Sequence, residues 1–313
     1  MTAFKLCIVV VWFGRWPAWI NLFLRSCVAN RRVHFIIFTD CDYLAAMNAP
    51  NIQYERLSLQ EFAAKILGSV GLTARQDLKA YKLCDFMPLF GFALSEYFKP
   101  FTHWGVSDSD LVLGDLEAFL DRDADIFSTH ADLISGHFFY VRNRKFFNEA
   151  FRLVRGWKGA LQTNVFYGLN EGAWSNVFLA KSLKAKAIET LLNFCGINWK
   201  VSAKELYTTS HTGIPWVDGT LEYPDHWIVV GGKVFGVKAD AVTELPYVHF
   251  MSMKPNAKYI PIELGEPMWQ HTDLSNAETV WDSPVIRIDA RGFHEVKTPA
   301  WWSKEGLETA ETH

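Results

Sequence analysis

Two aspartates separated by one residue are the strongest candidates for chemistry in this sequence. Asp108 and Asp110 follow Thr102–Ser107, which we expect to be a short strand, and precede a glycine turn at Gly114. At the end of a strand the chain leaves strict alternation, so both carboxylates can face one ion. Mn²⁺ and Mg²⁺ prefer such oxygen ligands and also bind the oxygens of a nucleotide diphosphate. The pattern predicts a site for Mn²⁺ or Mg²⁺, although an isolated Asp-x-Asp is also common in solvated loops.

A histidine and a lysine much later in the chain are the next candidates. His249 lies in the short apolar run Pro246–Met251, and Lys254 follows five residues after it. A third ligand from a distant segment would complete the metal site. Lys254 could contact a phosphate as a point charge. The alternative is a histidine at the end of a strand beside a surface lysine.

Lys82 and Asp85 lie in a segment that we expect to be helical, from about Gln76 to Phe98, with a break near Pro88 and Gly91. On a helix the lysine could meet a diphosphate while the aspartate meets a ribose or base edge. An exposed charge pair at this spacing is the alternative.

Polar groups around an expected strand, Leu133–Val141, could contact sugars. Gly136 would let a sugar approach the backbone closely, and His137 could bond to a donor or acceptor sugar. Glu171 precedes an expected helix and could orient an acceptor hydroxyl or act as a general base. The alternatives are a partly buried histidine and a carboxylate that favours a helix N-terminus.

The start of the chain predicts the elements that would position these groups. Leu6–Trp12 and Val33–Phe38 read as buried strands, and Pro17–Ala29 between them has apolar residues at helical spacing. Such a unit forms a right-handed parallel crossover, and ligands bind outside the carboxyl ends of its strands. The carboxyl end of the second of these strands leads to Thr39 and Asp40, which therefore lie at the expected ligand site.

The rest of the chain predicts an α/β fold with a mostly parallel sheet flanked by helices. Gly231-Gly232 between two apolar runs is a hairpin signature. We expect one domain over residues 1–255 and a C-terminal extension, residues 256–313, packed on it and disordered at its end. The other expected helices are Leu59–Leu67, Leu116–Leu120, Arg144–Arg155 and Ala173–Leu183, and the other expected strands are Asp125–Ser128 and Val285–Ile288.

Taken in order, these motifs resemble the GT-A (Rossmann-like) glycosyltransferases. The closest resemblance is to a bacterial polysaccharide family with "YKLCDF-P-x-x-G" and "WG-x-x-D-x-D-x-x-x-GD", over residues 5–255. The late His249…Lys254-Pro255 also resembles retaining lipooligosaccharide galactosyltransferases and glycogenin. In the bacterial family Asp-Glu stands where this chain has Asn170-Glu171.

The resemblance implies a metal-dependent transferase that moves a sugar from a nucleotide-diphosphate sugar to a hydroxyl of a surface glycan, with retention of configuration. It implies Mn²⁺ or Mg²⁺ ligands at Asp108, Asp110 and His249, and a diphosphate contact at Lys254. Thr39 and Asp40 would lie near the nucleoside. An inverting transferase with Glu171 as base is the alternative within the enzyme class.

Two other classes stay open from the residues alone. A non-catalytic carbohydrate-binding protein could use the abundant aromatics, with Trp174, Trp199, Trp216 and Trp227 as candidates for stacking on sugars. The two aspartates and His249 argue against that reading. A metal-dependent phosphohydrolase would need more clustered Asp and His ligands.

Composition limits the partners and the compartment. The net charge of −3 without a basic block argues against nucleic acid. Five cysteines without metal spacing suggest reduced thiols in a cytoplasmic protein. The apolar run at residues 6–13 is too short to span a membrane, so a lipid-linked acceptor would require peripheral contact at the inner membrane. Trp301-Trp302 or residues 12–23 could provide that contact.

Overall fold

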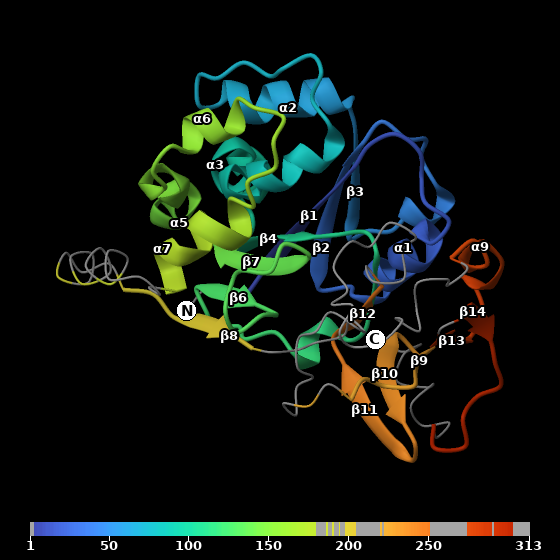
Figure 1. Ribbon diagram of the computed structural model, residues 1–313. Helices are drawn as coiled ribbons and strands as arrows, with labels where there is room; N and C mark the ends of the chain where they lie inside the picture. Colours follow the sequence, from blue (N-terminus) through green and yellow to red (C-terminus); the bar gives the residue numbers. More distant parts are fainter. Residues whose placement is uncertain are drawn as a thin grey trace.

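A seven-stranded, mostly parallel sheet forms the centre of the computed structural model (Figure 1). The structure describes residues 3–179, 198–204, 222–250, 274–289 and 291–302, and the single residues 186, 190, 194 and 220. The strands in sheet order are β3 (Ile52–Arg56), β2 (Val33–Thr39), β1 (Leu6–Trp12), β4 (His103–Ser107), β7 (Phe138–Arg142), β6 (Ile126–Ser128) and β8 (Val201–Ala203). Strands β3, β2, β1 and β4 run parallel, and β7 is antiparallel to both of its neighbours.

Both faces of this sheet are buried, which explains why its central strands are continuously apolar. On β1, Cys7 and Val9 belong to the core on one face, while Leu6, Ile8 and Val10 belong to the core on the other. This alternation is the consequence of the two-residue repeat of a strand covered on both sides. The Rossmann-like α/β class predicted from the sequence, with a mostly parallel sheet and flanking helices, is confirmed.

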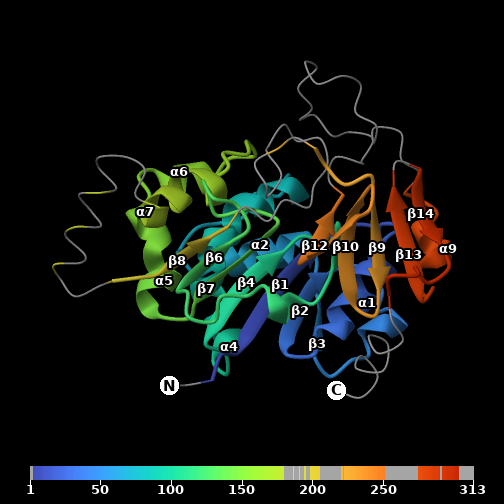
Figure 2. The ribbon, with the colours of Figure 1, turned by 90° about the horizontal axis from the view of Figure 1, so that it is seen from below.

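Helices cover the two faces unequally (Figures 1 and 2). Helix α1 packs on one face, and most of the others pack on the opposite face. The helical segments are α1 (Ile20–Ala29), η1 (Ala45–Met47), α2 (Leu59–Gly68), η2 (Ala80–Leu89), α3 (Phe90–Ala93), α4 (Ser95–Phe98), η3 (Leu116–Ala118), α5 (Lys145–Glu149), η4 (Ala150–Leu153), α6 (Trp157–Leu161), η5 (Asn170–Trp174), α7 (Ser175–Leu179) and α9 (Ala277–Val280). Among the described residues, no helix has the length and apolar character needed to cross a membrane.

Two smaller sheets pack beside α1. The first is antiparallel and consists, in sheet order, of β11 (Ala241–Leu245), β10 (Lys233–Lys238), β9 (His226–Val230), β13 (Val285–Asp289) and β14 (Gly292–Glu295). The second pairs β5 (Leu111–Leu113) with β12 (Tyr247–His249). The predicted hairpin at Gly231-Gly232 is present between β9 and β10, and both glycines have positive φ. Strand β13, from the expected C-terminal extension, pairs with β9.

The expected helix from Gln76 to Phe98 is wrong in its extent. The described chain has three short pieces there, and the first begins only at Ala80. The predicted break is present, because Pro88 lies in the 3₁₀ segment η2 and cannot donate a helical hydrogen bond. A Cβ on Gly91 would lie 2.5 Å from the Trp104 ring, so this glycine lets α3 pack closely against β4.

Three other expected elements differ in their limits. The strand expected at Leu133–Val141 begins at Phe138, because Ser128 Oγ bonds to Leu133 O and Ser135 N and holds the preceding residues in a loop. The helix expected at Arg144–Arg155 is divided into α5 and η4. The helix expected at Ala173–Leu183 begins earlier, with η5, and residues 180–183 lie outside the described part.

Substitution of Gly105 tests the packing of the central sheet. A Cβ at Gly105 on β4 would lie 2.2 Å from the carbonyl oxygen of Phe139 on β7. We expect Gly105→Ala to lower the free energy of unfolding by about 1–3 kcal/mol, since the strands must separate to admit the methyl group. Urea unfolding measures the change. Gly159→Ala in α6, where a Cβ meets nothing within 4 Å, is the control and should not destabilise. Equal effects of the two substitutions would contradict this packing.

Candidate metal centre

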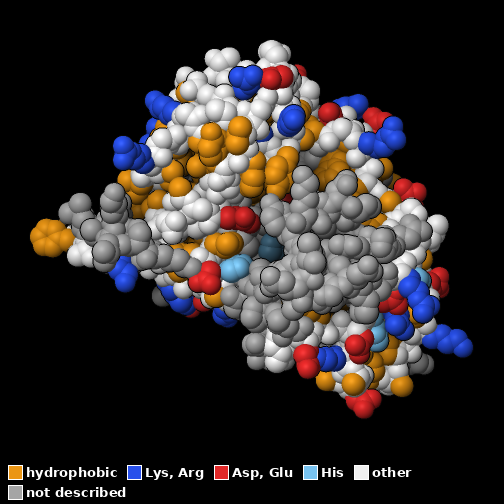
Figure 3. All heavy atoms as spheres, viewed as in Figure 1, with side chains coloured by type: hydrophobic (Ala, Val, Ile, Leu, Met, Phe, Trp, Pro, Cys, Tyr) orange, Lys and Arg blue, Asp and Glu red, His pale blue; other side chains and the backbone are white. Residues whose placement is uncertain are grey.

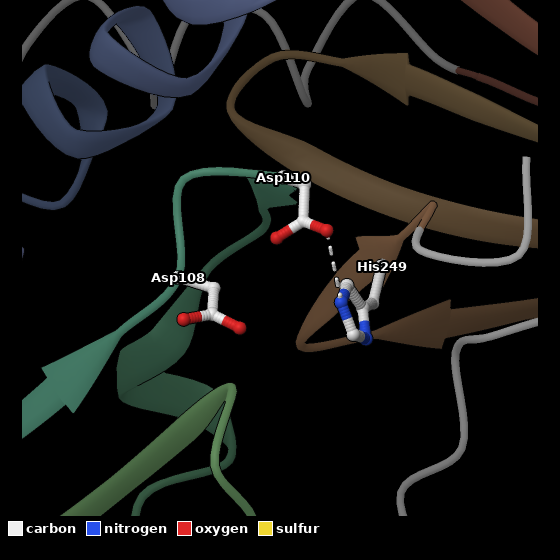
Figure 4. A group of neighbouring side chains, drawn as sticks. All are labelled: Asp108, Asp110 and His249. Atoms are coloured by element: carbon white, nitrogen blue, oxygen red, sulfur yellow. Dashed lines mark ion pairs between the residues drawn. The ribbon is translucent and has the colours of Figure 1, made fainter. Parts of the chain in front are cut away.

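Asp108, Asp110 and His249 meet at the carboxyl end of β4 (Figure 4). One ligand atom from each side chain lies within 4.8 Å of the others, and His249 Nε2 is 3.4 Å from Asp110 Oδ2. The pairing of β12 with β5 brings them together, because it sets His249 opposite Leu111 and joins Phe250 N to Asp110 O. The predicted convergence of these three residues is thus present.

The donor set of this cluster fits a divalent ion. Carboxylate oxygens and an imidazole nitrogen suit Mn²⁺ and Mg²⁺, the carboxylates above all. Asp110 and His249 are buried, while Asp108 is partly exposed. A cluster with one open side can accept oxygens from a second ligand, as a catalytic rather than a structural metal site does. We therefore regard the three side chains as a candidate metal centre.

His137 lies against this cluster. Its ring stacks on that of His249 with centroids 4.4 Å apart, and its Nε2 shares a hydrogen bond of 2.7 Å with the Tyr247 hydroxyl. Its carbonyl oxygen accepts a hydrogen bond from Asp108 N. Burial, and then the neighbouring His249, lower the pKa of His137 well below its usual value, which favours the neutral ring.

The carboxylate of Glu171 is hydrogen-bonded to the loop that contains Gly136 and His137. Its Oε1 accepts a hydrogen bond of 2.9 Å from Gly136 N, and the side chain is exposed. A Cβ on Gly136 would lie 2.8 Å from this oxygen and 2.9 Å from Asn170 Nδ2, so only glycine permits the contact. Glu171 and Asn170 lie in the π-helical turn η5, a local form that often occurs at functional sites.

Thr39 and Asp40 end β2 at the edge where the carboxyl ends of the parallel strands lie. Asp40 Oδ1 accepts a hydrogen bond of 2.7 Å from Gly14 N, which joins the loops after β1 and β2. The Thr39 side chain is fully buried, and its hydroxyl accepts from Cys41 N. The expected contact of this pair with a nucleoside stays a prediction.

Lys82 and Asp85 differ most from expectation. They form an ion pair of 2.7 Å with both side chains fully buried, instead of an exposed pair on a helix surface. Lys82 Nζ also donates to the carbonyl oxygens of Ala160 and Val165, so its three donors are used. Asp85 accepts from the backbone N–H groups of two residues in the loop between α6 and η5, Tyr167 and Leu169.

These contacts correct the interpretation of Lys82 and Asp85. With every donor of the lysine engaged by protein groups, the pair has no group left to meet a diphosphate or a ribose. Its contacts instead fix the loop between α6 and η5. The sequence could not show this, since the partners are backbone groups of residues 160–169.

The remaining sequence candidates fall in different places. Lys254 and Trp216 lie outside the described residues. Trp174 and Trp227 are fully buried in the core, so neither presents a face to a sugar. Trp199 is partly buried and stacks on Phe146.

Tyr247 is a member of the site that sequence reasoning missed. It lies two residues before His249, and side chains at this spacing share one face of a strand. That alternation was the signal that could have found it. Ser109 was also missed, and its buried hydroxyl has no hydrogen-bond partner in the described structure.

Comparison with protein-family models assigns the sequence to one family. Residues 8–263 match the family of unknown function DUF6625. The chain belongs to this family. The match includes the candidate metal centre and the strands of the central sheet, apart from the first two residues of β1. No curated protein matches the sequence.

Among solved structures, similar chains include two glycosyltransferases. One is involved in glycosylation of the major capsid of PBCV-1, with 12% identity, a TM-score of 0.31, and coverage of 65% of this chain and 83% of that one. The other is the apo form of GlyE from Streptococcus pneumoniae TIGR4, with 15% identity, a TM-score of 0.31, and coverage of 67% and 47% respectively. At these TM-scores neither decides what this member of DUF6625 does.

Removal of the Lys82 charge tests the buried ion pair. We expect Lys82→Met to lower the free energy of unfolding by about 3–5 kcal/mol, because it leaves the Asp85 carboxylate buried without its cation. Urea unfolding of the variant gives the value. Lys99→Met is the matched control, since the Lys99–Glu96 pair has the same spacing but is exposed, and its loss should cost less than about 1 kcal/mol. Equally small losses for both variants would contradict the assigned role.

Proposed function

We propose that this protein is a metal-dependent glycosyltransferase of the GT-A type, which transfers a sugar from a nucleotide-diphosphate sugar to a hydroxyl group of a glycan. The observation that carries the proposal is the meeting of Asp108, Asp110 and His249 at the carboxyl edge of a mostly parallel sheet. Ligands of such sheets bind at that edge. The order of motifs in the sequence, which resembles that of GT-A glycosyltransferases, also supports it.

In the proposed reaction Asp108, Asp110 and His249 hold Mn²⁺ or Mg²⁺. The ion, when bound, neutralises the charge that develops on the departing diphosphate. Lys254 supplies a second positive charge for the same oxygens. Thr39 and Asp40 lie near the nucleoside, at the ends of strands that point to the same edge.

The transfer breaks the bond between the anomeric carbon and the diphosphate oxygen and forms one to the acceptor oxygen. The acceptor proton passes to the leaving diphosphate, so the proposed retaining reaction needs no strong base. Glu171 orients the acceptor hydroxyl with the carboxylate that Gly136 N holds in place. His137, kept neutral by burial, supports the ring of His249 and contacts the sugar.

The acceptor in this proposal belongs to a surface glycan, and the reaction takes place on the cytoplasmic side. A lipid-linked acceptor would bring the protein to the inner membrane by peripheral contact. An inverting reaction with Glu171 as base is the alternative within the same class, because the residue is exposed and its carboxylate is bonded to Gly136 N, next to His137.

Nucleotide binding tests the proposal directly. We expect one of UDP, GDP, CDP and TDP to raise the melting temperature in the presence of Mn²⁺ but not without it. A ligand at one hundred times its Kd adds about 2.7 kcal/mol to the stability of the folded state, which gives a clear thermal shift. Asp110→Asn should abolish the shift, because it removes a metal ligand while keeping the size of the side chain.

Asp123→Asn is the control, since Asp123 is exposed and lies outside the cluster. It should respond to nucleotide and Mn²⁺ like the wild type. If no nucleotide shifts the melting temperature of the folded wild-type protein, the transferase proposal fails, and a carbohydrate-binding role becomes the better account.

A further inference from the structure

Exposed hydrophobic side chains gather on two adjoining segments near the candidate metal centre. Three of the eight large hydrophobic side chains that the described residues expose lie there: Tyr81 is 63% exposed, Val165 60% and Tyr167 55%. Tyr81 is near the start of η2, and the other two are in the loop between α6 and η5. Figure 3 shows hydrophobic side chains on the face that also presents acidic and histidine side chains. A group of exposed hydrophobic side chains of this kind is a candidate binding surface.

Three aromatic rings lie on these two chain segments, which the buried ion pair joins. Tyr81 and Phe166 meet edge to face, with ring centroids 4.8 Å apart. Tyr167 is next to Phe166 in the chain, and Lys82 Nζ lies 4.9 Å from the centre of its ring. We call Tyr81, Phe166 and Tyr167 the aromatic platform.

The buried ion pair holds the aromatic platform in place. Asp85 accepts from the backbone N–H of Tyr167, and Lys82 binds the carbonyl oxygen of Val165, so both ends of this short stretch are fixed. Burying two charges is costly, and here the buried pair also bonds to backbone groups of this stretch. A surface that is already ordered loses little entropy when a ligand binds.

The aromatic platform lies close to the groups that would react. Tyr167 precedes Glu171 by four residues, so their Cα atoms are at most about 14 Å apart. Glu171 in turn bonds to Gly136, next to His137 in the metal-centre loop. Cys84, on the same segment as Tyr81, is near enough that the charges of Asp108 and Glu171 help to raise its pKa, after burial.

Two of the three basic side chains nearest the aromatic platform in the chain are paired within the protein, while Lys79, two residues before Tyr81, is exposed. Lys82 is buried and paired with Asp85. Arg75 forms a two-bond pair with Asp77, each bond 2.9 Å, and the Asp77 carbonyl oxygen is bonded to Asn164 at the edge of the loop. Aromatic faces with polar tips suit the apolar C–H face and hydroxyl groups of a neutral sugar.

We propose that the aromatic platform binds a non-reacting sugar of the acceptor, which is therefore an oligosaccharide of at least two residues. This inference rests on the proposed function and names the class of its acceptor. The stacked sugar sets the position of the next one, whose hydroxyl then lies at Glu171.

Saturation-transfer NMR with maltose, cellobiose, lactose and chitobiose tests this surface on the full chain. We expect at least one of these disaccharides to bind the wild type. Tyr81→Ala and Tyr167→Ala should each weaken that binding about tenfold, whereas Tyr167→Phe should stay within about twofold because it keeps the ring. Trp301→Ala, which removes an exposed ring in another part of the molecule, should bind like the wild type.

The inference is overturned if no disaccharide binds the wild type, or if the two alanine variants bind as well as it does. The thermal shift with nucleotide and Mn²⁺, measured on the same samples, reports separately on the proposed function. A nucleotide response without sugar binding would contradict only the proposed sugar binding at the aromatic platform. Sugar binding at the aromatic platform without a nucleotide response would contradict the proposed transferase function. It would support a carbohydrate-binding role instead.

Discussion

The pairing of β5 with β12 is the constraint on which the candidate metal centre depends. Strand β5 begins directly after Asp110, and β12 ends at His249, so three backbone pairings fix two ligands from distant parts of the chain. The apolar residues of these strands are buried in the cores beside α1, which keeps the pairing out of water. The third ligand, Asp108, follows β4 directly and is bonded to the carbonyl oxygen of His137.

A second buried interaction organises the loop that leads to Glu171. The ion pair of Lys82 and Asp85 joins η2 to the loop before η5, and η5 carries Glu171. Through it, a face with aromatic rings and a carboxylate that contacts Gly136 are held beside the metal centre. In the proposed function the metal centre binds the donor diphosphate and the aromatic platform binds the acceptor. Contacts within the protein position both groups of residues.

The sequence predicted the parts of the structure that depend on local pattern. The crossover of β1, α1 and β2 follows from apolar periodicity, and the hairpin at Gly231-Gly232 follows from turn chemistry. The convergence of Asp108, Asp110 and His249 was predicted from the residue types together with the resemblance of the motif order to GT-A glycosyltransferases. The burial of Lys82 was not, since its partners are backbone carbonyls that carry no signal in the sequence. The late start of β7 was missed for a similar reason, because side-chain bonds of Ser128 decide it.

The most direct measurement of the central claim is an anomalous-scattering map of crystals grown with Mn²⁺ and recorded near the manganese absorption edge. The account predicts one strong peak between Asp108, Asp110 and His249, at about 2.0–2.3 Å from the ligand atoms, the range of such bonds in proteins. The peak should be absent from crystals of Asp110→Asn grown in the same way. A peak at other residues, or no peak at saturating Mn²⁺, would contradict the assignment of these side chains as a metal centre.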